Sequence, residues 1–162
     1  IKTNHYIYTY VRHKGPFKPY CKQCRRTEDI LHLFIDCEKI KKIWRHYRDI
    51  YQRLTNAPIF DTTKILLGIS TPTNDKYTQK LVQTLTSKIL MNIWKSRNKL
   101  QFDKTYVPEN KIIENVNAEM KYLITVFYKN FKERDKIEDF KSQFCINNAL
   151  CEIENETLKF NL

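Results

Sequence analysis

Apolar residues recur every three or four positions in three stretches of the chain, the spacing that places them along one side of an α-helix. These stretches cover residues 38–54, residues 76–102, and a segment from Glu109 to about Lys136. Their apolar faces consist of Ile40, Ile43, Trp44, Tyr47, Ile50, Tyr51 and Leu54, then Leu81, Val82, Leu85, Ile89, Ile93 and Trp94, then Ile112, Val116, Leu123, Phe127 and Phe131. The pattern therefore predicts a mainly α fold with a bundle of about three longer helices.

Helix-breaking and turn residues mark the segments between these helices. Glycine and proline at positions 15, 16 and 19 predict an irregular start. Residues 55–75 are predicted to form a linker around a short helical turn that Asp61 caps and Gly68 ends. Pro108 is predicted at the first position of the third helix. The weak alternation from Ala149 to Leu162, with Glu154-Asn155 as the turn, predicts a short C-terminal β-hairpin.

Composition narrows the class of protein. Hydrophobic residues make up 41% of the chain and aromatic residues 13%, which is enough to build a core. The chain has only two glycines, so a glycine-rich phosphate loop is excluded. No apolar run approaches the roughly 18 residues of a membrane span, and no secretion signal begins the chain. Because it starts at Ile1, with methionine only at positions 91 and 120, we interpret it as part of a longer, soluble, intracellular polypeptide.

Positive charge is concentrated in the first third of the chain. The net charge is +11, and residues 1–54 hold 13 Lys/Arg against 5 Asp/Glu, whereas residues 55–162 hold 16 against 13. A one-sided basic surface attracts phosphate and releases counterions when it binds. A solvated basic face without a partner has the same composition, so charge alone leaves both readings open.

The sharpest motif is formed by three cysteines and a histidine with the spacing C-x2-C-x7-H-x4-C, at Cys21, Cys24, His32 and Cys37. Three thiolates and one imidazole supply the four ligands of a tetrahedral structural Zn²⁺ site, which leaves no open position for a catalytic water. The alternatives are a redox dithiol, disulfides, or unrelated buried thiols. A thioredoxin-type context is absent for the first, and the odd number of five cysteines argues against the second.

The surroundings of this motif resemble the zinc-knuckle (CCHC) region that follows the polymerase in LINE-type, non-LTR retrotransposon reverse transcriptases. The matching elements are Thr3-Asn4-His5, Cys21 and Cys24, Glu28, His32-Leu33-Phe34-Ile35-Asp36-Cys37 and Lys41-Lys42-Ile43-Trp44, with weaker matches at Pro58-Ile59-Phe60-Asp61, Leu66-Leu67-Gly68-Ile69 and Ile93-Trp94-Lys95-Ser96-Arg97-Asn98. Two positions depart from the family pattern, since Asn4 and Arg25 stand where glycine is common.

The resemblance implies a domain that holds element RNA or target DNA during target-primed reverse transcription, with the remainder of the parent enzyme as its partner. It also implies a ribonucleoprotein particle in the nucleus and cytoplasm. This chain contains neither the paired aspartates of the polymerase active site nor the endonuclease domain, so we expect no catalysis from it. We predict three parts: residues 1–37 as the irregular segment with the knuckle, residues 38–146 as the helical domain, and residues 147–162 as the tail or hairpin.

Lysine and arginine side chains near the knuckle and on two helices are the predicted nucleic-acid contacts. They are Lys14, Lys18, Lys22, Arg25, Arg26, Lys41, Arg45 and Arg48, with Lys95, Arg97 and Lys99 as a second group. A protein-interaction module, in which zinc is only a structural staple, is the alternative function. An independent Cys/His enzyme would have to use Cys145, Cys151, His5, His13 or His46, and no nucleophile motif supports it.

Overall fold

The computed structural model describes residues 19–57, 61–63 and 75–162. Within these ranges the elements are the π-helix η1 (His32–Asp36), α2 (Glu38–Thr55), α4 (Lys76–Asn98), the π-helix η2 (Lys99–Asp103), α5 (Glu109–Glu133), α6 (Ile137–Phe144), the 3-10 turn η3 (Ile146–Asn148), β1 (Cys151–Glu154) and β2 (Thr157–Phe160). The described part of the chain is thus mainly α and ends in a two-stranded hairpin, as the sequence predicts.

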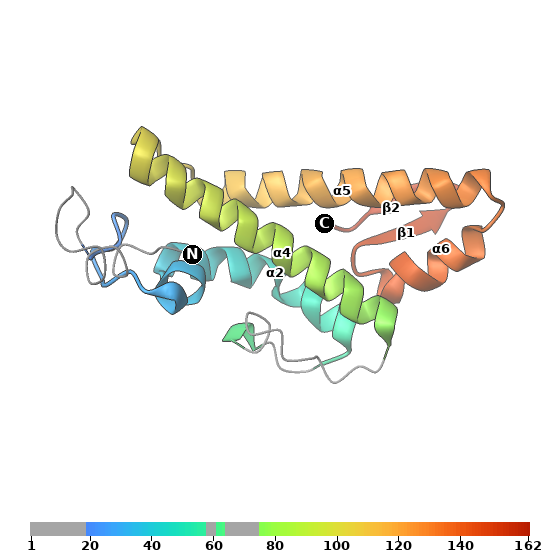
Figure 1. Ribbon diagram of the computed structural model, residues 1–162. Coiled ribbons are helices and arrows are strands. Elements are labelled where there is room, and N and C mark those ends of the chain that lie inside the picture. The colour runs from blue at the N-terminus through green and yellow to red at the C-terminus, as the bar shows by residue number, and fades with distance from the viewer. Residues whose placement is uncertain (1–18, 58–60, 64–74) are drawn as a thin grey trace.

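The three long helices form the body of the molecule. Helix α4 crosses between α2 and α5, and α6 folds back below the end of α5 with the hairpin beside it (Figure 1). Each pair of the long helices is in contact. Their facing side chains form one core in which Ile43, Leu85, Ile89 and Val116 are fully buried. Burial of these apolar faces supplies the main driving force for folding of the bundle.

Two tyrosines of α2 tie the bundle together through hydrogen bonds as well as through burial. The hydroxyl of Tyr47 donates to Asn117 Oδ1 at 2.8 Å, and the hydroxyl of Tyr51 lies 2.7 Å from Thr86 Oγ1. Both rings are almost completely buried. A buried phenol without a partner would lose stability, so these bonds fix the rotation of α2 against α4 and α5.

The apolar face of α5 differs in part from the predicted one. Ile112 and Val116 are buried as expected, but the row continues through Met120 and Ile124, each fully buried, whereas Phe127 is 37% exposed. The buried residues recur every four positions, and such a row fits the groove of a neighbouring helix. This packing geometry explains why Met120 and Ile124 are buried and Phe127 is not.

The third predicted helix ends three residues earlier than expected, and a further short helix follows it. Helix α5 ends at Glu133, and Asp135 takes a left-handed conformation with φ 54°, which reverses the chain into α6. The reversal lets Phe140 and Phe144 of α6 pack against Phe131 of α5. No glycine or proline marks this break, so the helical periodicity alone predicted a longer helix.

Smaller predictions about element ends are confirmed in part. The Asp61 carboxylate accepts from the Thr63 backbone N–H at 3.0 Å, as expected of a cap, while Gly68 lies outside the described residues. Pro108 precedes the first turn of α5 instead of occupying it. The hairpin turn is Asn155-Glu156, one residue later than predicted, and both residues have the positive φ of a type I′ turn.

Within the described residues, one continuous core joins the parts that the sequence predicts as knuckle, helical domain and tail. Cys21 and Phe34 near the knuckle, Tyr47 in the bundle and Leu150 beside the hairpin belong to one continuous buried cluster. The knuckle and the C-terminal hairpin therefore pack on the helical bundle as parts of one unit. Among the described helices, none has the length and apolar character that crossing a membrane requires.

Candidate metal centre and the basic surface around it

The four predicted ligands lie together. The Sγ atoms of Cys21, Cys24 and Cys37 and a ring nitrogen of His32 are all within 4.8 Å of one another. Cys24 Sγ is 3.1 Å from His32 Nε2 and 4.0 Å from Cys37 Sγ. Metal–ligand bonds of about 2.0–2.3 Å in a tetrahedron separate ligand atoms by similar distances. The cluster can therefore hold a metal ion, with His32 Nε2 as the nitrogen ligand.

A tight turn brings the first two cysteines to the site. The Arg25 N–H donates to the Cys21 carbonyl at 2.9 Å, and the Cys21 N–H donates to the Arg26 carbonyl at 2.7 Å. The Gln23 N–H points at Cys21 Sγ over 3.4 Å, which suits a sulfur that carries negative charge. Arg25 has φ 64°, in the left-handed region that favours glycine. The turn that a glycine commonly makes is thus made here by an arginine.

A π-helical turn brings the second pair of ligands to the site. The Cys37 N–H donates to the His32 carbonyl at 3.1 Å, a bond across five residues that places the two ligands one turn apart on the same side. The carboxylate of Asp29 accepts from the His32 N–H at 2.7 Å and holds the start of this turn. The four-residue gap between His32 and Cys37 is therefore matched to a π turn.

Thiol acidity in this cluster reflects how closely the sulfur atoms are packed. A hydrogen bond with Cys37, followed by burial, raises the pKa of Cys21 to about 12, while the bond from Cys21 lowers the pKa of Cys37. A divalent cation bound by all three sulfur atoms would stabilise them together as thiolates, as expected of a metal site.

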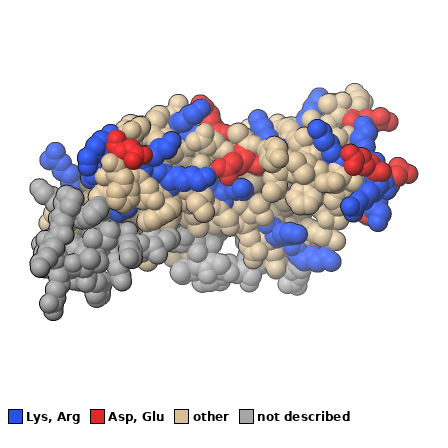
Figure 2. Space-filling view, turned by 45° about the horizontal axis from the view of Figure 1, so that its top comes forward, with Lys and Arg blue, Asp and Glu red and all other residues tan. Residues whose placement is uncertain are grey.

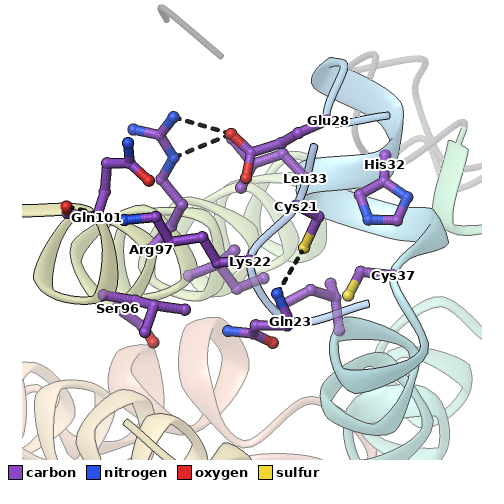
Figure 3. Close-up of a pocket in the computed structure, with 13 residues that line it drawn as sticks. Cys21, Lys22, Gln23, Glu28, His32, Leu33, Cys37, Ser96, Arg97 and Gln101 are labelled. Atoms are coloured by element: carbon purple, nitrogen blue, oxygen red, sulfur yellow. Dashed lines mark hydrogen bonds and ion pairs between the residues drawn. The ribbon is translucent and has the colours of Figure 1, made fainter. Parts of the chain in front are cut away.

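A buried ion pair attaches the knuckle to α4. Glu28 Oε1 accepts from Arg97 Nη2 at 2.8 Å and from Arg97 Nε at 3.1 Å, and both side chains are less than 10% exposed (Figure 3). Beside this pair, Lys22 Nζ donates to the Gln101 carbonyl at 3.1 Å, so the predicted contact residue Lys22 takes part in docking the knuckle. Partial burial, helped by the nearby charge of Lys104, lowers the pKa of Lys22.

The prediction that Arg97 contacts nucleic acid needs correction, because this guanidinium is inside the protein and paired with Glu28. The sequence did contain the signal. Position 97 continues the buried row of Leu85, Ile89 and Ile93 at a spacing of four residues, so the arginine lies on the apolar face of α4. A buried arginine at such a position requires a carboxylate partner, and Glu28 supplies it.

A second link runs from η1 to α2. The indole N–H of Trp44 donates to the carbonyl oxygen of Phe34 at 2.6 Å, and both side chains are buried. Because the π turn leaves backbone carbonyls without an ordinary α-helical partner, the indole satisfies one of them. Trp44 is therefore buried, as predicted, and also supports the turn that carries two metal ligands.

A small cavity of about 30 Å³ separates the knuckle from the end of α4. Its wall includes Cys21, Glu28, His32 and Arg97. A space of this size admits water but no organic substrate, because ligand pockets are roughly ten times larger. The surroundings of the metal cluster therefore resemble a structural centre more than a catalytic one.

Most of the other predicted nucleic-acid contacts are on the surface. The exposed ones are Lys22, Arg25, Arg26, Lys41, Arg45, Arg48, Lys95 and Lys99, and Lys14 and Lys18 lie outside the described residues. On the face in Figure 2, basic side chains cover more of the surface than acidic ones and gather toward both ends of the molecule. Lys95 of this set lies 3.7 Å from the carboxylate of Glu119 on α5, which partly neutralises it.

Cations from the knuckle and from α2 act on the carboxylate of Glu38, and Lys41 Nζ contacts it at 2.9 Å. Lys41 lowers the pKa of Glu38, first through a hydrogen bond and then through its charge, and the charges of Arg26 and Arg45 act in the same direction. Arg26 lies in the metal-binding segment between Cys24 and His32, and Lys41 and Arg45 lie in α2, which begins directly after Cys37. Their proximity joins the knuckle and the first helix into one basic surface.

No protein-family model, curated protein or solved structure matches this chain. The resemblance to LINE-type reverse transcriptases therefore stays a prediction from residues 3–44 and the weaker elements after them.

Proposed function

We propose that this chain is a zinc-stabilised nucleic-acid-binding module. Three thiolates and one imidazole form a soft, nitrogen-containing ligand set that suits Zn²⁺ better than harder cations such as Mg²⁺ or Ca²⁺. Four protein ligands complete a tetrahedral shell and leave no position for a reactive water. The ion would hold the Cys21 turn and the π turn together while the Glu28–Arg97 pair fixes both to α4.

The observation that carries the proposal is that Arg26, Lys41 and Arg45 are exposed and that their charges all act on Glu38, which Lys41 contacts at 2.9 Å. One carboxylate offsets only part of three positive charges, and Arg48 extends the same face of α2 one turn further. Such a surface with an excess of arginine suits phosphate groups, which accept hydrogen bonds from the planar guanidinium. Phosphate contacts position a nucleic acid without reading its sequence.

The resemblance supplies the biological setting of the proposal. We propose that the parent protein is a LINE-type reverse transcriptase and that the module holds element RNA or target DNA near the polymerase in a ribonucleoprotein particle. The link between Glu28 and Arg97 supports this, because each residue lies in an element on which the resemblance rests. The acidic residue after the first cysteine pair contacts the arginine of the tryptophan-arginine-asparagine element. This contact would explain why the two elements occur together.

Fluorescence anisotropy with zinc-loaded protein tests the proposal. Labelled single-stranded RNA, single-stranded DNA and duplex DNA of equal length would be titrated at several salt concentrations. Phosphate binding predicts a linear fall of log K with log salt, with a slope of about −0.7 to −0.9 for each phosphate contact. The absence of binding to all three at low salt would contradict the proposed function.

A protein-interaction module is the second candidate, and one feature of α5 favours it. Tyr122, Val126 and Phe127 are exposed on its outer face, with Tyr122 at 74%, and they border a hollow of about 280 Å³ next to Lys88. Exposed apolar residues that lie together often mark a protein contact. Binding to the remainder of the parent enzyme that is insensitive to salt and lost in Tyr122→Ser with Phe127→Ser would favour this candidate.

A further inference from the structure

Two cysteines outside the metal cluster lie next to each other at the C-terminal end of the molecule. Cys145 follows α6 and Cys151 begins β1, and their Sγ atoms are 3.9 Å apart. Both are free thiols, Cys151 is fully buried and Cys145 is partly accessible. A disulfide has a sulfur–sulfur bond of about 2.0 Å, so a modest approach of the two side chains would close it.

The loop between the two cysteines is short and tightly held. Asn147 and Asn148 have φ 48° and 50°, so the chain reverses between α6 and β1. The Asn147 side chain donates to the Arg53 carbonyl at 2.7 Å, and Arg53 Nη1 donates to the Asn148 carbonyl at 3.1 Å. These bonds to the end of α2 keep both cysteines in place, so their proximity belongs to the fold itself.

The two thiols are also unequal in a way that suits thiol–disulfide exchange. A hydrogen bond from Cys151 lowers the pKa of Cys145, and the charge of Lys141 acts in the same direction. The same bond and burial raise the pKa of Cys151. Cys145 is therefore the more nucleophilic and the more accessible of the two, while Cys151 is protected from solvent.

We propose that Cys145 and Cys151 form a redox-active dithiol that small-molecule disulfides such as oxidised glutathione convert to an intramolecular disulfide. The Cys145 thiolate attacks one sulfur of the small disulfide, which forms a mixed disulfide and releases one small thiolate. Cys151 then loses its proton to solvent, and its thiolate attacks the Cys145 sulfur and releases the second small thiolate. Two protein thiols are thereby oxidised and one small disulfide is reduced to two thiols.

The bond would join the end of α6 covalently to the first strand of the hairpin. The thiol of Cys151 already lies against the end of α6, where it donates to the carbonyl of Phe144 over 3.6 Å, and the disulfide would replace that bond. Oxidation is therefore expected to raise the melting temperature and to slow proteolysis of the hairpin, because it constrains the unfolded chain. The dithiol is independent of the nucleic-acid proposal and can hold whether or not that proposal does.

Peptide mapping of zinc-loaded protein in glutathione buffers of graded redox potential tests the inference. No Lys or Arg lies between residues 142 and 158, so trypsin releases both cysteines on a single peptide, 142–159, which contains no other thiol. After acid quenching and alkylation, the peptide from wild-type protein should be lighter by the mass of two hydrogens and should carry no alkyl group, as expected of an internal disulfide. Cys151→Ser should stop at a glutathione adduct on Cys145, and Cys145→Ser should remain largely unmodified.

Circular dichroism would show that both variants keep the wild-type helicity, and the wild-type peptide gives the answer even if a variant unfolds. A peptide 142–159 that stays fully alkylated in folded wild-type protein across the whole series would overturn the inference. So would an adduct that forms as readily on Cys151 in Cys145→Ser, because the proposed order of attack requires Cys145 first.

Discussion

Glu28 and Arg97, separated by 69 residues in the sequence, form a buried ion pair in which two guanidinium N–H groups donate to one carboxylate oxygen. Glu28 follows the metal-binding turn, and Arg97 lies in the last turn of α4. A charged pair of this kind tolerates little change in distance or angle. The pair therefore fixes how the metal centre is oriented on the helical bundle.

Breaking this pair from one side should be more harmful than removing it entirely. Glu28→Gln leaves the Arg97 charge buried without a carboxylate, and we expect a loss of about 3–5 kcal/mol in the free energy of unfolding. The double variant Glu28→Leu with Arg97→Met removes both charges and should lose clearly less. Urea denaturation followed by circular dichroism measures each value, and equal losses in the single and double variants would contradict the expectation.

Removal of the metal should loosen the knuckle more than the bundle. Structural zinc contributes about 10–16 kcal/mol of apparent binding energy in small modules, which is comparable with the stability of a whole domain. Metal analysis should give about one zinc per chain, and Cys24→Ser should lower it strongly. After chelation, hydrogen exchange should accelerate first in residues 19–37, and protection in α4 and α5 should persist. Unchanged zinc content in Cys24→Ser would show that the cluster does not hold the metal.

Arg25 offers a direct test of backbone strain in the knuckle turn. At φ 64° a side chain with a Cβ is disfavoured, so Arg25→Gly should be more stable than Arg25→Ala by about 1 kcal/mol. Both variants remove the same charge, so any loss of nucleic-acid affinity should be equal in the two. Thermal denaturation of the zinc-loaded proteins gives the stability difference, and a more stable alanine variant would contradict the proposed strain.

Arg45 and Arg48 on α2 should contribute general affinity for nucleic acid. Replacing both with glutamine should weaken binding about equally for different sequences, and each lost phosphate contact should reduce the salt slope by about 0.7–0.9. Lys129→Gln with Lys132→Gln is the matched control, because it removes the same charge from exposed positions at the far end of α5 (Figure 1). Equal effects of both pairs would mean that net charge, and not this surface, determines binding.

Asp75 should make the start of α4 sensitive to acid. Its carboxylate accepts from the Tyr77 and Thr78 N–H groups, and the bonds from Thr78 hold the pKa of Asp75 below its ordinary value of 3.8. The lowered folded-state pKa means that the stabilisation is complete above the unfolded pKa and is lost as the pH falls through the folded one. Asp75→Ala should cost about 1 kcal/mol at neutral pH. Asp75→Asn should keep part of the cap and lose less stability than wild type when the pH falls below about 4.

The long helices and the metal ligands were predictable because each depends on local spacing. Helix α2 matches its predicted bounds to within one residue, since its apolar residues recur at three- and four-residue steps along its whole length. The four ligands are recognisable for a similar reason, because chelation by a short turn requires two cysteines with two residues between them. In both cases the sequence pattern and the tertiary structure impose the same requirement.

The remaining features depend on contacts that no local pattern specifies. Helix α6 is stabilised by the packing of Phe140 and Phe144 against Phe131. The chain reverses at Asp135, where no glycine marks the turn. Arg97 was assigned to the surface from its charge, although its position on α4 places it among buried side chains. Its charge and its helical position indicate different environments, and the carboxylate of Glu28 explains how the interior accommodates the charge.

The five-residue interval between His32 and Cys37 also sets the rotational phase of α2 relative to the metal. Helix α2 begins directly after Cys37, and each residue turns an α-helix by about 100°. Deleting one residue from the π turn could still leave a histidine and a cysteine one helical turn apart. The coordination would then survive while Ile43 and Trp44 rotated away from α4 and α5. Metal binding and the packing of the bundle would become mutually exclusive, so the extra residue is what allows one segment of chain to serve both.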